Sequence, residues 1–192
     1  FSLSRGLGDV YKRQISIVSL LVSATNRETI DIANSIGYPL LIKAAAGGGG
    51  KGIKIVREES ELLSSMRITQ QEALNSFGSD EIYLEKFIEN PRHIEVQVIA
   101  DNHGNALHFF ERECSVQRKK QKIIEEAPAC NLDESIIEEL FELCLNCLKK
   151  MKYKGVGTFE FLYKDSEFYF IEMNTRLQVE HTVTEMITNI DL

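Results

Sequence analysis

The chain has 192 residues, of which 43% are hydrophobic, so it is long enough for one α/β domain or a pair of subdomains with a real core. Asp and Glu outnumber Lys and Arg by 29 to 22, which gives a formal net charge of −7 at pH 7. This balance argues against non-specific nucleic-acid binding, because phosphate backbones favour clustered basic side chains.

The first 26 residues give no fold assignment. Residues 1–14 lack an initiator methionine and resemble translated adapter sequence, so we exclude them as a non-native, assembly-derived segment; a divergent native terminus is the alternative. Residues 15–26 are apolar and serine-rich and stay unassigned. They are too few to span a membrane, which takes about 20 apolar residues.

A glycine-rich loop, Gly47–Gly50, lies between the predicted strands Leu40–Ala44 and Ile53–Arg57. Glycine accepts positive φ angles and has no Cβ, so such a loop can lay its backbone N–H groups against phosphate oxygens. Lys43 and Lys51 supply positive charge beside it. No GK[ST] follows and the loop leads into a strand, which favours a flap over a Walker loop. A plain linker is the alternative, although linkers seldom lie between β-branched apolar runs.

Hydrophobic periodicity predicts further helices and strands. Antiparallel strands with covering helices indicate an α+β fold. The predicted helices are Arg27–Ile36, Ser60–Asn75, Leu132–Lys152 and one that begins at about His181, and the predicted strands are Glu81–Phe87, His93–Ala100 and Ala106–Gln117.

Two alternating runs on either side of the short loop Asp165–Glu167 predict a β-hairpin. If Lys164 pairs with Phe168, Glu160 lies opposite Glu172. Directly opposed strand residues have Cβ atoms about 4.5–5.5 Å apart, so like charges there repel unless something neutralises them. A divalent cation would do so, and magnesium prefers oxygen ligands. Two solvated glutamates on an outer sheet face are the alternative.

The chain has four cysteines and no secretory signal beside them. Cys144 and Cys147 lie three apart on the apolar face of the predicted helix Leu132–Lys152. This position favours buried free thiols over a redox pair or a zinc site. A reducing cytoplasm is therefore the expected location.

Several stretches follow the glycine loop in a recognisable order: EKFIENPRHIEVQ (Glu85–Gln97), ERECSVQR (Glu111–Arg118), EEAP (Glu125–Pro128) and EMNTRLQVEH (Glu172–His181). Together with that loop they resemble biotin carboxylase, the ATP-grasp enzyme of the biotin-dependent carboxylases. The match runs over residues 27–192 at the family's spacing. The resemblance implies a partial ATP-grasp domain, with antiparallel sheets and covering helices, that is truncated at both ends and inactive alone.

The resemblance also implies the residues that bind ATP. Residues Glu85 to Ile88 would hold adenine through backbone groups, and His93 would lie near the ribose; a surface histidine is the alternative. The implied metal ligands for Mg²⁺ or Mn²⁺ are Glu160, Glu172 and Asn174. The full ATP-binding set is Lys43, Gly49, Gly50, Glu85, Lys86, Phe87, Ile88, His93, Gln117, Lys120, Glu160 and Glu172.

A second implied set binds bicarbonate beside the γ-phosphate: Lys122, Arg176, Gln178 and the Val179 backbone. Arginine suits a planar oxyanion, because its fork donates two parallel hydrogen bonds. Arg176 and Glu180 would be catalytic, with Glu180 as the base that removes the bicarbonate proton. An ordinary i,i+4 ion pair at a helix start is the alternative for these two residues. The basic run Arg118–Lys122 would then line the pocket, instead of forming a solvated face or a nucleic-acid patch.

Two positions depart from the family's pattern. Lys120 stands where the family usually has histidine, and it can donate to an oxyanion but cannot accept a hydrogen bond or stack as imidazole can. Thr182 replaces a proline after the V-E-H sequence, a variant that several carboxylase subtypes share.

The implied partners are a biotin carboxyl carrier protein, a carboxyltransferase and, at full length, a second copy of the enzyme. Carrier-bound biotin would be the substrate, with ATP as cofactor. Acetyl-CoA carboxylase and fatty acid biosynthesis are one expected setting, although the final carboxyl acceptor stays open. Two other classes are alternatives: another ATP-grasp ligase, such as a carbamoyl-phosphate synthase half, and a non-catalytic nucleotide-binding module.

Overall fold

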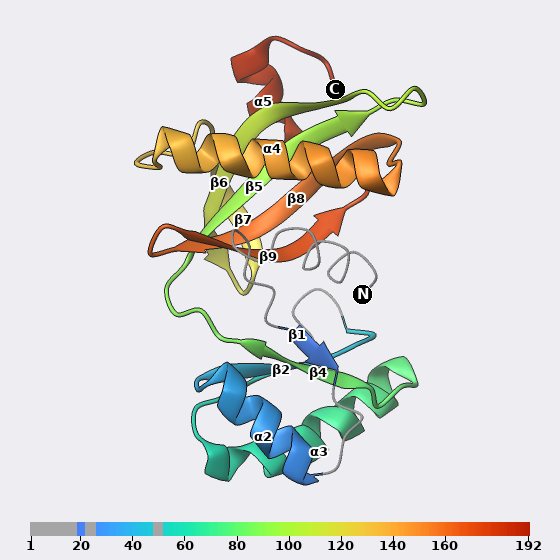
Figure 1. Ribbon diagram of the computed structural model, residues 1–192, viewed down its shortest axis with the longest axis vertical. Coiled ribbons are helices and arrows are strands. Elements are labelled where there is room, and N and C mark those ends of the chain that lie inside the picture. The colour runs from blue at the N-terminus through green and yellow to red at the C-terminus, as the bar shows by residue number, and fades with distance from the viewer. Residues whose placement is uncertain (1–18, 22–25, 48–51) are drawn as a thin grey trace. The chain divides into compact units, whose positions relative to one another are not determined.

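The structure is a computed structural model that describes residues 19–21, 26–47 and 52–192. The chain divides into two compact units, residues 18–89 and 90–192, and each is described by itself (Figure 1). Each contains an antiparallel sheet with helices packed on it, which confirms the predicted α+β class. The predictions for residues 1–14, and for Gly49, Gly50 and Lys51, lie outside the described residues.

The smaller unit is a four-stranded sheet, in the order β1-β4-β2-β3, with two helices on it (Figure 1). Buried side chains of alternate strand positions, such as Leu40, Ile42 and Leu84, pack with Ala33 and Leu62 of the helices. Because strand side chains alternate between faces, Lys43 and Glu85 point to the other face. The elements are β1 (Ser19–Leu21), α2 (Asn26–Ile36), β2 (Leu40–Ala44), β3 (Ile53–Val56), α3 (Glu59–Phe77) and β4 (Ile82–Lys86).

The larger unit is a five-stranded antiparallel sheet in the order β7-β6-β5-β8-β9, with the long helix α4 across one face (Figure 1). Ile94 and Val96 of the sheet and Leu140, Cys144 and Leu148 of α4 lie in its core. The alternate positions of the strands therefore turn their side chains to the opposite face, where polar residues gather. The elements are β5 (Arg92–Ala100), β6 (Ala106–Arg118), β7 (Gln121–Glu126), α4 (Glu134–Met151), β8 (Gly155–Lys164), β9 (Glu167–Asn174) and α5 (His181–Thr188).

Most predicted elements occur where periodicity placed them, with ends that differ by one or two residues. Two strands were missed, β1 and β7. Strand β7 follows a two-residue turn in which Lys119 and Lys120 have φ angles of 51° and 64°. Hairpin turns with two positive φ angles usually carry Asn or Gly, so a pair of lysines gave no turn signal. Cys144 and Cys147 are buried free thiols, as predicted.

The predicted loop of the last hairpin is wrong by one residue. Asp165 and Ser166 alone form the turn, with φ angles of 51° and 63°, and Lys164 pairs with Glu167. The prediction paired Lys164 with Phe168. Positive φ at both central positions matches the right-handed twist of the two strands, which favours this two-residue turn.

A β-bulge restores the predicted pairing further along the same hairpin. The register shifts after the pair Phe161 and Phe170, which leaves Ile171 as an extra residue, and Glu160 then lies opposite Glu172. A bulge changes which face the following side chains occupy. Phe168, Phe170 and Met173 can therefore all pack against the core, although they do not keep one alternation.

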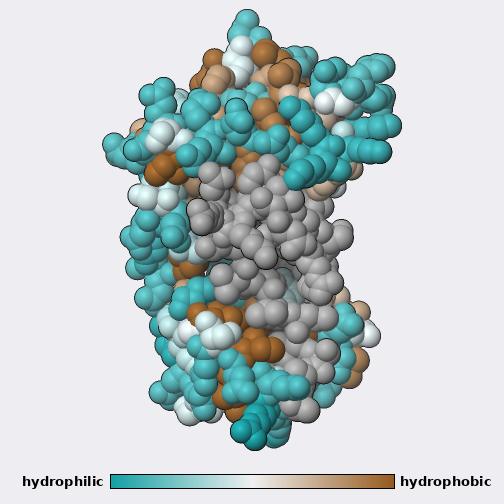
Figure 2. All heavy atoms as spheres, in the orientation of Figure 1, coloured by the Kyte–Doolittle hydropathy of each residue, from teal (hydrophilic) through white to brown (hydrophobic). Residues whose placement is uncertain are grey.

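On the face drawn in Figure 2, most of the coloured residues are hydrophilic, with apolar residues in small groups. The most exposed large apolar side chains in the described part of the chain are Val179 and Met186, at 88% and 84%. Single exposed apolar side chains are common on protein surfaces. Among the described helices, none is long and apolar enough to cross a membrane.

The core of the larger unit gives a first testable prediction. Phe159 is fully buried and its ring lies against those of Phe161 and Phe170. We expect Phe159→Ala to lower the free energy of unfolding by about 3–5 kcal/mol, because it removes buried apolar area and leaves a cavity. Urea unfolding followed by circular dichroism measures the change. The control is Leu107→Ala, at a side chain 61% exposed, which should change stability by less than about 0.5 kcal/mol. Equal losses in the two variants would contradict this account of the core.

Candidate active site

The polar face of the larger sheet carries a row of charged residues in register. Arg112 of β6 pairs with Glu95 of β5, Glu95 with Glu160 of β8, and Glu160 with Glu172 of β9. Arg112, Glu95 and Glu160 are buried, whereas Glu172 is exposed. Buried carboxylates need partners of opposite charge, because an unpaired buried charge is costly.

Lys122 of β7 supplies the positive charge at the centre of this face. Its ammonium lies 2.5 Å from Glu95 Oε2, 2.8 Å from Glu160 Oε1 and 2.5 Å from Glu180 Oε1. The predicted base Glu180 and the predicted metal ligand Glu160 thus bind one ammonium group. Of the basic run Arg118–Lys122, Lys122 contacts this cluster, whereas residues 118–121 are exposed.

The charges of the cluster stabilise one another. Burial by itself raises the pKa of Glu160, but the contacts from His93 and Lys122 outweigh it and hold the pKa at about 2. Burial likewise raises the pKa of Glu180, and the hydrogen bond from Lys122 outweighs it and lowers that pKa. Burial lowers the pKa of Lys122, but the carboxylates of Glu95 and Glu160 raise it well above its ordinary value. Glu160, Glu180 and Lys122 are therefore ionised at neutral pH.

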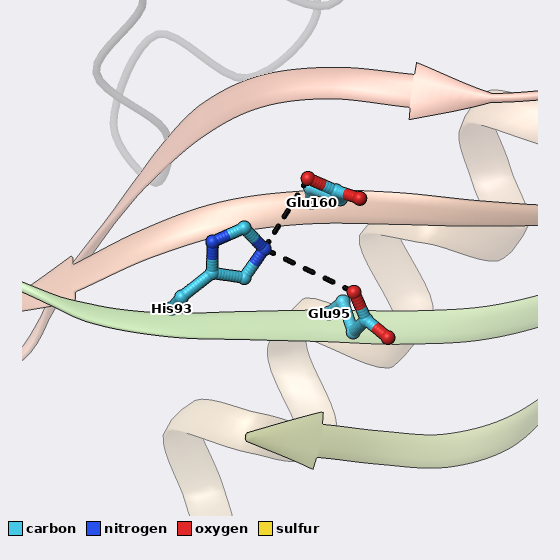
Figure 3. A group of neighbouring side chains, drawn as sticks. All are labelled: His93, Glu95 and Glu160. Carbon is cyan, nitrogen blue, oxygen red and sulfur yellow. Dashed lines mark ion pairs between the residues drawn. The ribbon is translucent and has the colours of Figure 1, made fainter. Parts of the chain in front are cut away.

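Glu160 receives further hydrogen bonds from the predicted site. Asn174 Nδ2 and Gln178 Nε2 donate to its Oε1 at 3.0 and 2.9 Å. His93 Nε2 lies 3.2 Å from Glu160 Oε2 without hydrogen-bond geometry, and 3.9 Å from Glu95 Oε2 (Figure 3). Glu160 is therefore no solvated glutamate, and Lys122 is a cationic partner that it shares with Glu95 and Glu180.

His93, Glu95 and Glu160 point toward one another closely enough to hold a metal ion (Figure 3). The Lys122 ammonium, however, bonds one oxygen of Glu95 and one oxygen of Glu160. A cation placed among the three residues would meet the ammonium group at short range. This trio is therefore an ion-pair cluster with a histidine at its edge.

His93 is largely buried, so it is not a surface histidine. Its Nδ1 lies 3.0 Å from Nε2 of Gln117, and this amide also donates to the Cys114 carbonyl at 2.8 Å. Two residues of the predicted ATP-binding set thus lie in contact. Lys120 belongs to the same set and occupies the turn between β6 and β7.

The segment that follows β9 carries the remaining predicted residues. Arg176 is exposed, its Nη1 donates to the Leu177 carbonyl at 3.2 Å, and it lies before the start of helix α5. The alternative of a helical i,i+4 pair between Arg176 and Glu180 is wrong. Glu180 pairs with Lys122, and it occupies the N-cap position, so Arg176 lies outside the helix. Val179 is exposed beside Glu180.

The smaller unit carries the other part of the predicted ATP-binding set. Lys43 and Glu85 form an ion pair on the face away from the helices. Lys86 Nζ donates to the carbonyls of Gly37 and Tyr38 at 3.1 and 3.3 Å. Phe87 and Ile88 are partly buried at the end of β4.

Sequence reasoning missed three residues that hold the cluster together: Glu95, Arg112 and Thr184. Arg112 donates to Glu95 Oε1 and to Thr184 Oγ1 at 2.6 and 2.8 Å. A signal for Glu95 was present, because His93, Glu95 and Gln97 alternate with apolar residues on one strand. Three polar residues on one strand face indicate a polar site rather than a core.

A family model described as carbamoyl-phosphate synthase L chain, ATP binding domain, matches residues 11–192. The chain belongs to this family. Its sequence relatives include the biotin carboxylases of Haemophilus influenzae, 54% identical over 169 residues, and of Pseudomonas aeruginosa, 55% identical over 161 residues. The matches cover 88% and 84% of this chain but only 37% and 36% of those relatives. The chain thus spans little more than a third of their length.

Solved structures agree with this assignment. A biotin carboxylase complex with β,γ-ATP from Campylobacter jejuni has a TM-score of 0.87 and 45% sequence identity, over 99% of this chain and 42% of that one. The biotin carboxylase domain of the Hydrogenobacter thermophilus 2-oxoglutarate carboxylase, solved with MgADP, ADP and bicarbonate, has the same TM-score at 43% identity, over 99% and 41%. The resemblance to biotin carboxylase and the partial ATP-grasp fold are therefore confirmed.

Proposed function

We propose that this chain supplies the ATP-grasp part of a biotin carboxylase. In this reaction a bicarbonate oxygen attacks the γ-phosphorus of ATP and ADP leaves. The carboxyphosphate that forms decomposes to CO₂ and phosphate, and the CO₂ carboxylates N1′ of biotin on a carrier protein. The observation that carries the proposal is Lys122, a cation bonded at once to Glu95, Glu160 and Glu180 in a fold shared with a biotin carboxylase domain solved with MgADP and bicarbonate.

The proposed bicarbonate site joins Lys122, Arg176, Gln178 and the Val179 backbone. Three carboxylates surround Lys122, so this cluster alone would repel an anion. The exposed guanidinium of Arg176 would bring the second positive charge that an anionic substrate needs. Glu180, ionised at neutral pH, would accept the bicarbonate proton.

Glu160, Glu172 and Asn174 would hold Mg²⁺ or Mn²⁺. They fit a hard cation, because all three carry oxygen ligand atoms, Glu172 lies opposite Glu160, and Asn174 is two residues further along β9. Asn174 also contacts Glu160 directly. When bound, the metal would neutralise phosphate charge. The proposed ATP contacts comprise Lys43, Gly49, Gly50, the hinge Glu85–Ile88, His93, Gln117 and Lys120.

The proposed setting follows from the relatives. They include pyruvate carboxylases and the propionyl-CoA carboxylase alpha chain as well as biotin carboxylases, so several carboxyl acceptors fit the same chemistry. A biotin carrier, a carboxyltransferase, a second copy of the enzyme and a cytoplasmic location complete the proposal. Acetyl-CoA is one proposed carboxyl acceptor, beside pyruvate and propionyl-CoA.

The test uses a full-length chimera in which residues 27–192 replace the matching segment of the Haemophilus influenzae relative. We expect ADP release to depend on bicarbonate, and carboxybiotin to form when biotin is present. Biotin-stimulated ATP cleavage without any bicarbonate requirement, in a chimera that binds ATP, would refute the proposal.

Carbamoyl-phosphate synthesis is the second candidate function, because the matching family is described by that enzyme. Carbamoyl phosphate formed with ammonia, and no carboxybiotin, would favour it.

A substitution at Glu172 tests the proposed metal site. In the chimera, we expect Glu172→Gln to slow ATP cleavage and alter its Mg²⁺ dependence, because it removes a ligand of the metal. Thermal stability of the metal-free protein should stay equal or rise, because one of two facing negative charges is gone. The control is Glu142→Gln on the exposed side of α4, which should change neither. A large loss of thermal stability as the only effect would make Glu172 a structural residue.

A further inference from the structure

The largest fully buried side chain in the described part of the chain is an arginine. Arg112 lies in the middle of β6 with none of its surface exposed. Its Nε donates to Glu95 Oε1 at 2.6 Å, and its Nη1 donates to Gln97 Oε1 at 2.7 Å and Thr184 Oγ1 at 2.8 Å. A guanidinium buried so completely is costly unless its bonds are well formed.

Glu95 connects Arg112 to the cation of the proposed site. Its two oxygens have different partners, since Oε1 accepts from Arg112 and Oε2 accepts from Lys122 at 2.5 Å. Glu95 is itself fully buried, so neither oxygen has water as an alternative partner. Arg112 therefore holds one oxygen of the carboxylate whose other oxygen is one of the three that bind the Lys122 ammonium.

Thr184 connects Arg112 to the proposed base. It is fully buried on α5, and Glu180 is the residue that precedes this helix and caps it. The carbonyl of Glu180 accepts from the Val183 backbone N–H at 3.2 Å, in the first turn. A bond from Arg112 to Thr184 therefore anchors the helix turn that carries Glu180.

We propose that Arg112 is a positioning residue that holds Glu95 and the start of α5 so that Lys122 meets Glu180. This inference deepens the proposed function, on which its kinetic consequence rests. The guanidinium is suited to the task because its planar fork donates in several fixed directions, whereas a lysine ammonium does not reproduce that geometry. Arg112 has no role in contact with the substrate.

The first test is spectroscopic and needs no activity. In the 192-residue chain with ¹⁵N-labelled lysine, the Lys122 Nζ resonance is assigned by its loss in Lys122→Met. We expect Thr184→Val, which removes the acceptor while keeping the shape, to shift this resonance, and Thr184→Ser, which keeps the hydroxyl, to restore it. The matched control is Thr69→Val at a buried threonine of α3, whose hydroxyl bonds only along its own helix to Ser65 at 2.9 Å.

The second test is kinetic and uses the chimera. Thr184→Val should lower kcat/KM for bicarbonate by roughly tenfold to a hundredfold, as misplaced groups do, while KM for ATP stays within about twofold. Thr184→Ser should retain the rate. A Lys122 resonance that is unchanged in a folded Thr184→Val chain and in a folded Arg112→Lys chain would overturn the positioning role. A chimera without bicarbonate-dependent cleavage would refute the proposed function instead, and the resonance would still decide the role of Arg112.

Discussion

Replacing Lys122 by methionine will lower the free energy of unfolding of this chain by about 3–5 kcal/mol, because it leaves buried carboxylates without their cation. Lys122 is the ammonium that Glu95, Glu160 and Glu180 share, and its side chain is 16% exposed. Methionine keeps most of the length and removes the charge. Urea unfolding at pH 7 in metal-free buffer measures the loss.

A control and a second substitution make this result specific. Lys149→Met, at an exposed position of α4, should change stability by less than about 0.5 kcal/mol. In Lys122→Met, the added change Glu160→Gln should recover part of the loss, because it removes one of the unpaired charges. An unfolding midpoint equal to that of the unchanged chain would show that these carboxylates do not depend on Lys122.

The second large effect concerns turnover. In the full-length chimera, Glu180→Gln should slow bicarbonate-dependent ATP cleavage by about 10²- to 10⁴-fold, the usual contribution of a general base. Glutamine still offers an oxygen to Lys122, so the chimera should stay folded and bind ATP. Initial rates of ADP release at saturating ATP, with bicarbonate varied, measure the effect.

Glu185→Gln is the matched control for this prediction, since Glu185 lies one turn further along α5 and contacts His181 at 3.6 Å. It should leave the rate within about twofold, because its carboxylate contacts His181 and the Leu192 backbone N–H instead of Lys122. If Glu180→Gln kept the rate of the parent chimera, Glu180 would be a structural partner of Lys122 only.

The comparison of the last hairpin with its prediction shows how local rules succeed and fail. Alternation predicted both strands, because side-chain period depends only on the sequence. Loop length did not follow from the residue types, since Asp165 and Ser166 turn the chain without glycine. The prediction that Glu160 faces Glu172 is correct only because a bulge at Ile171 cancels the error of one residue in the predicted loop.

The charge argument for that hairpin considered only a metal ion as the partner of its two glutamates. In the structure Lys122, which is 38 residues away from Glu160 in the chain, also bonds Glu160. A partner on another strand has no signature in the hairpin's own sequence.

By itself, the sequence determined the class of the fold, most helices and strands, and the residues that carry the family's motifs, because each depends on neighbours within a few turns or on matched spacing. Tertiary structure alone decided which charges meet. Arg112 bonds Thr184 at a separation of 72 residues, and Lys122 bonds Glu180 at a separation of 58. Such contacts depend on strand register and on where α5 packs, and a burial cost of several kcal/mol per ion makes the buried partners obligatory once the sheet has formed.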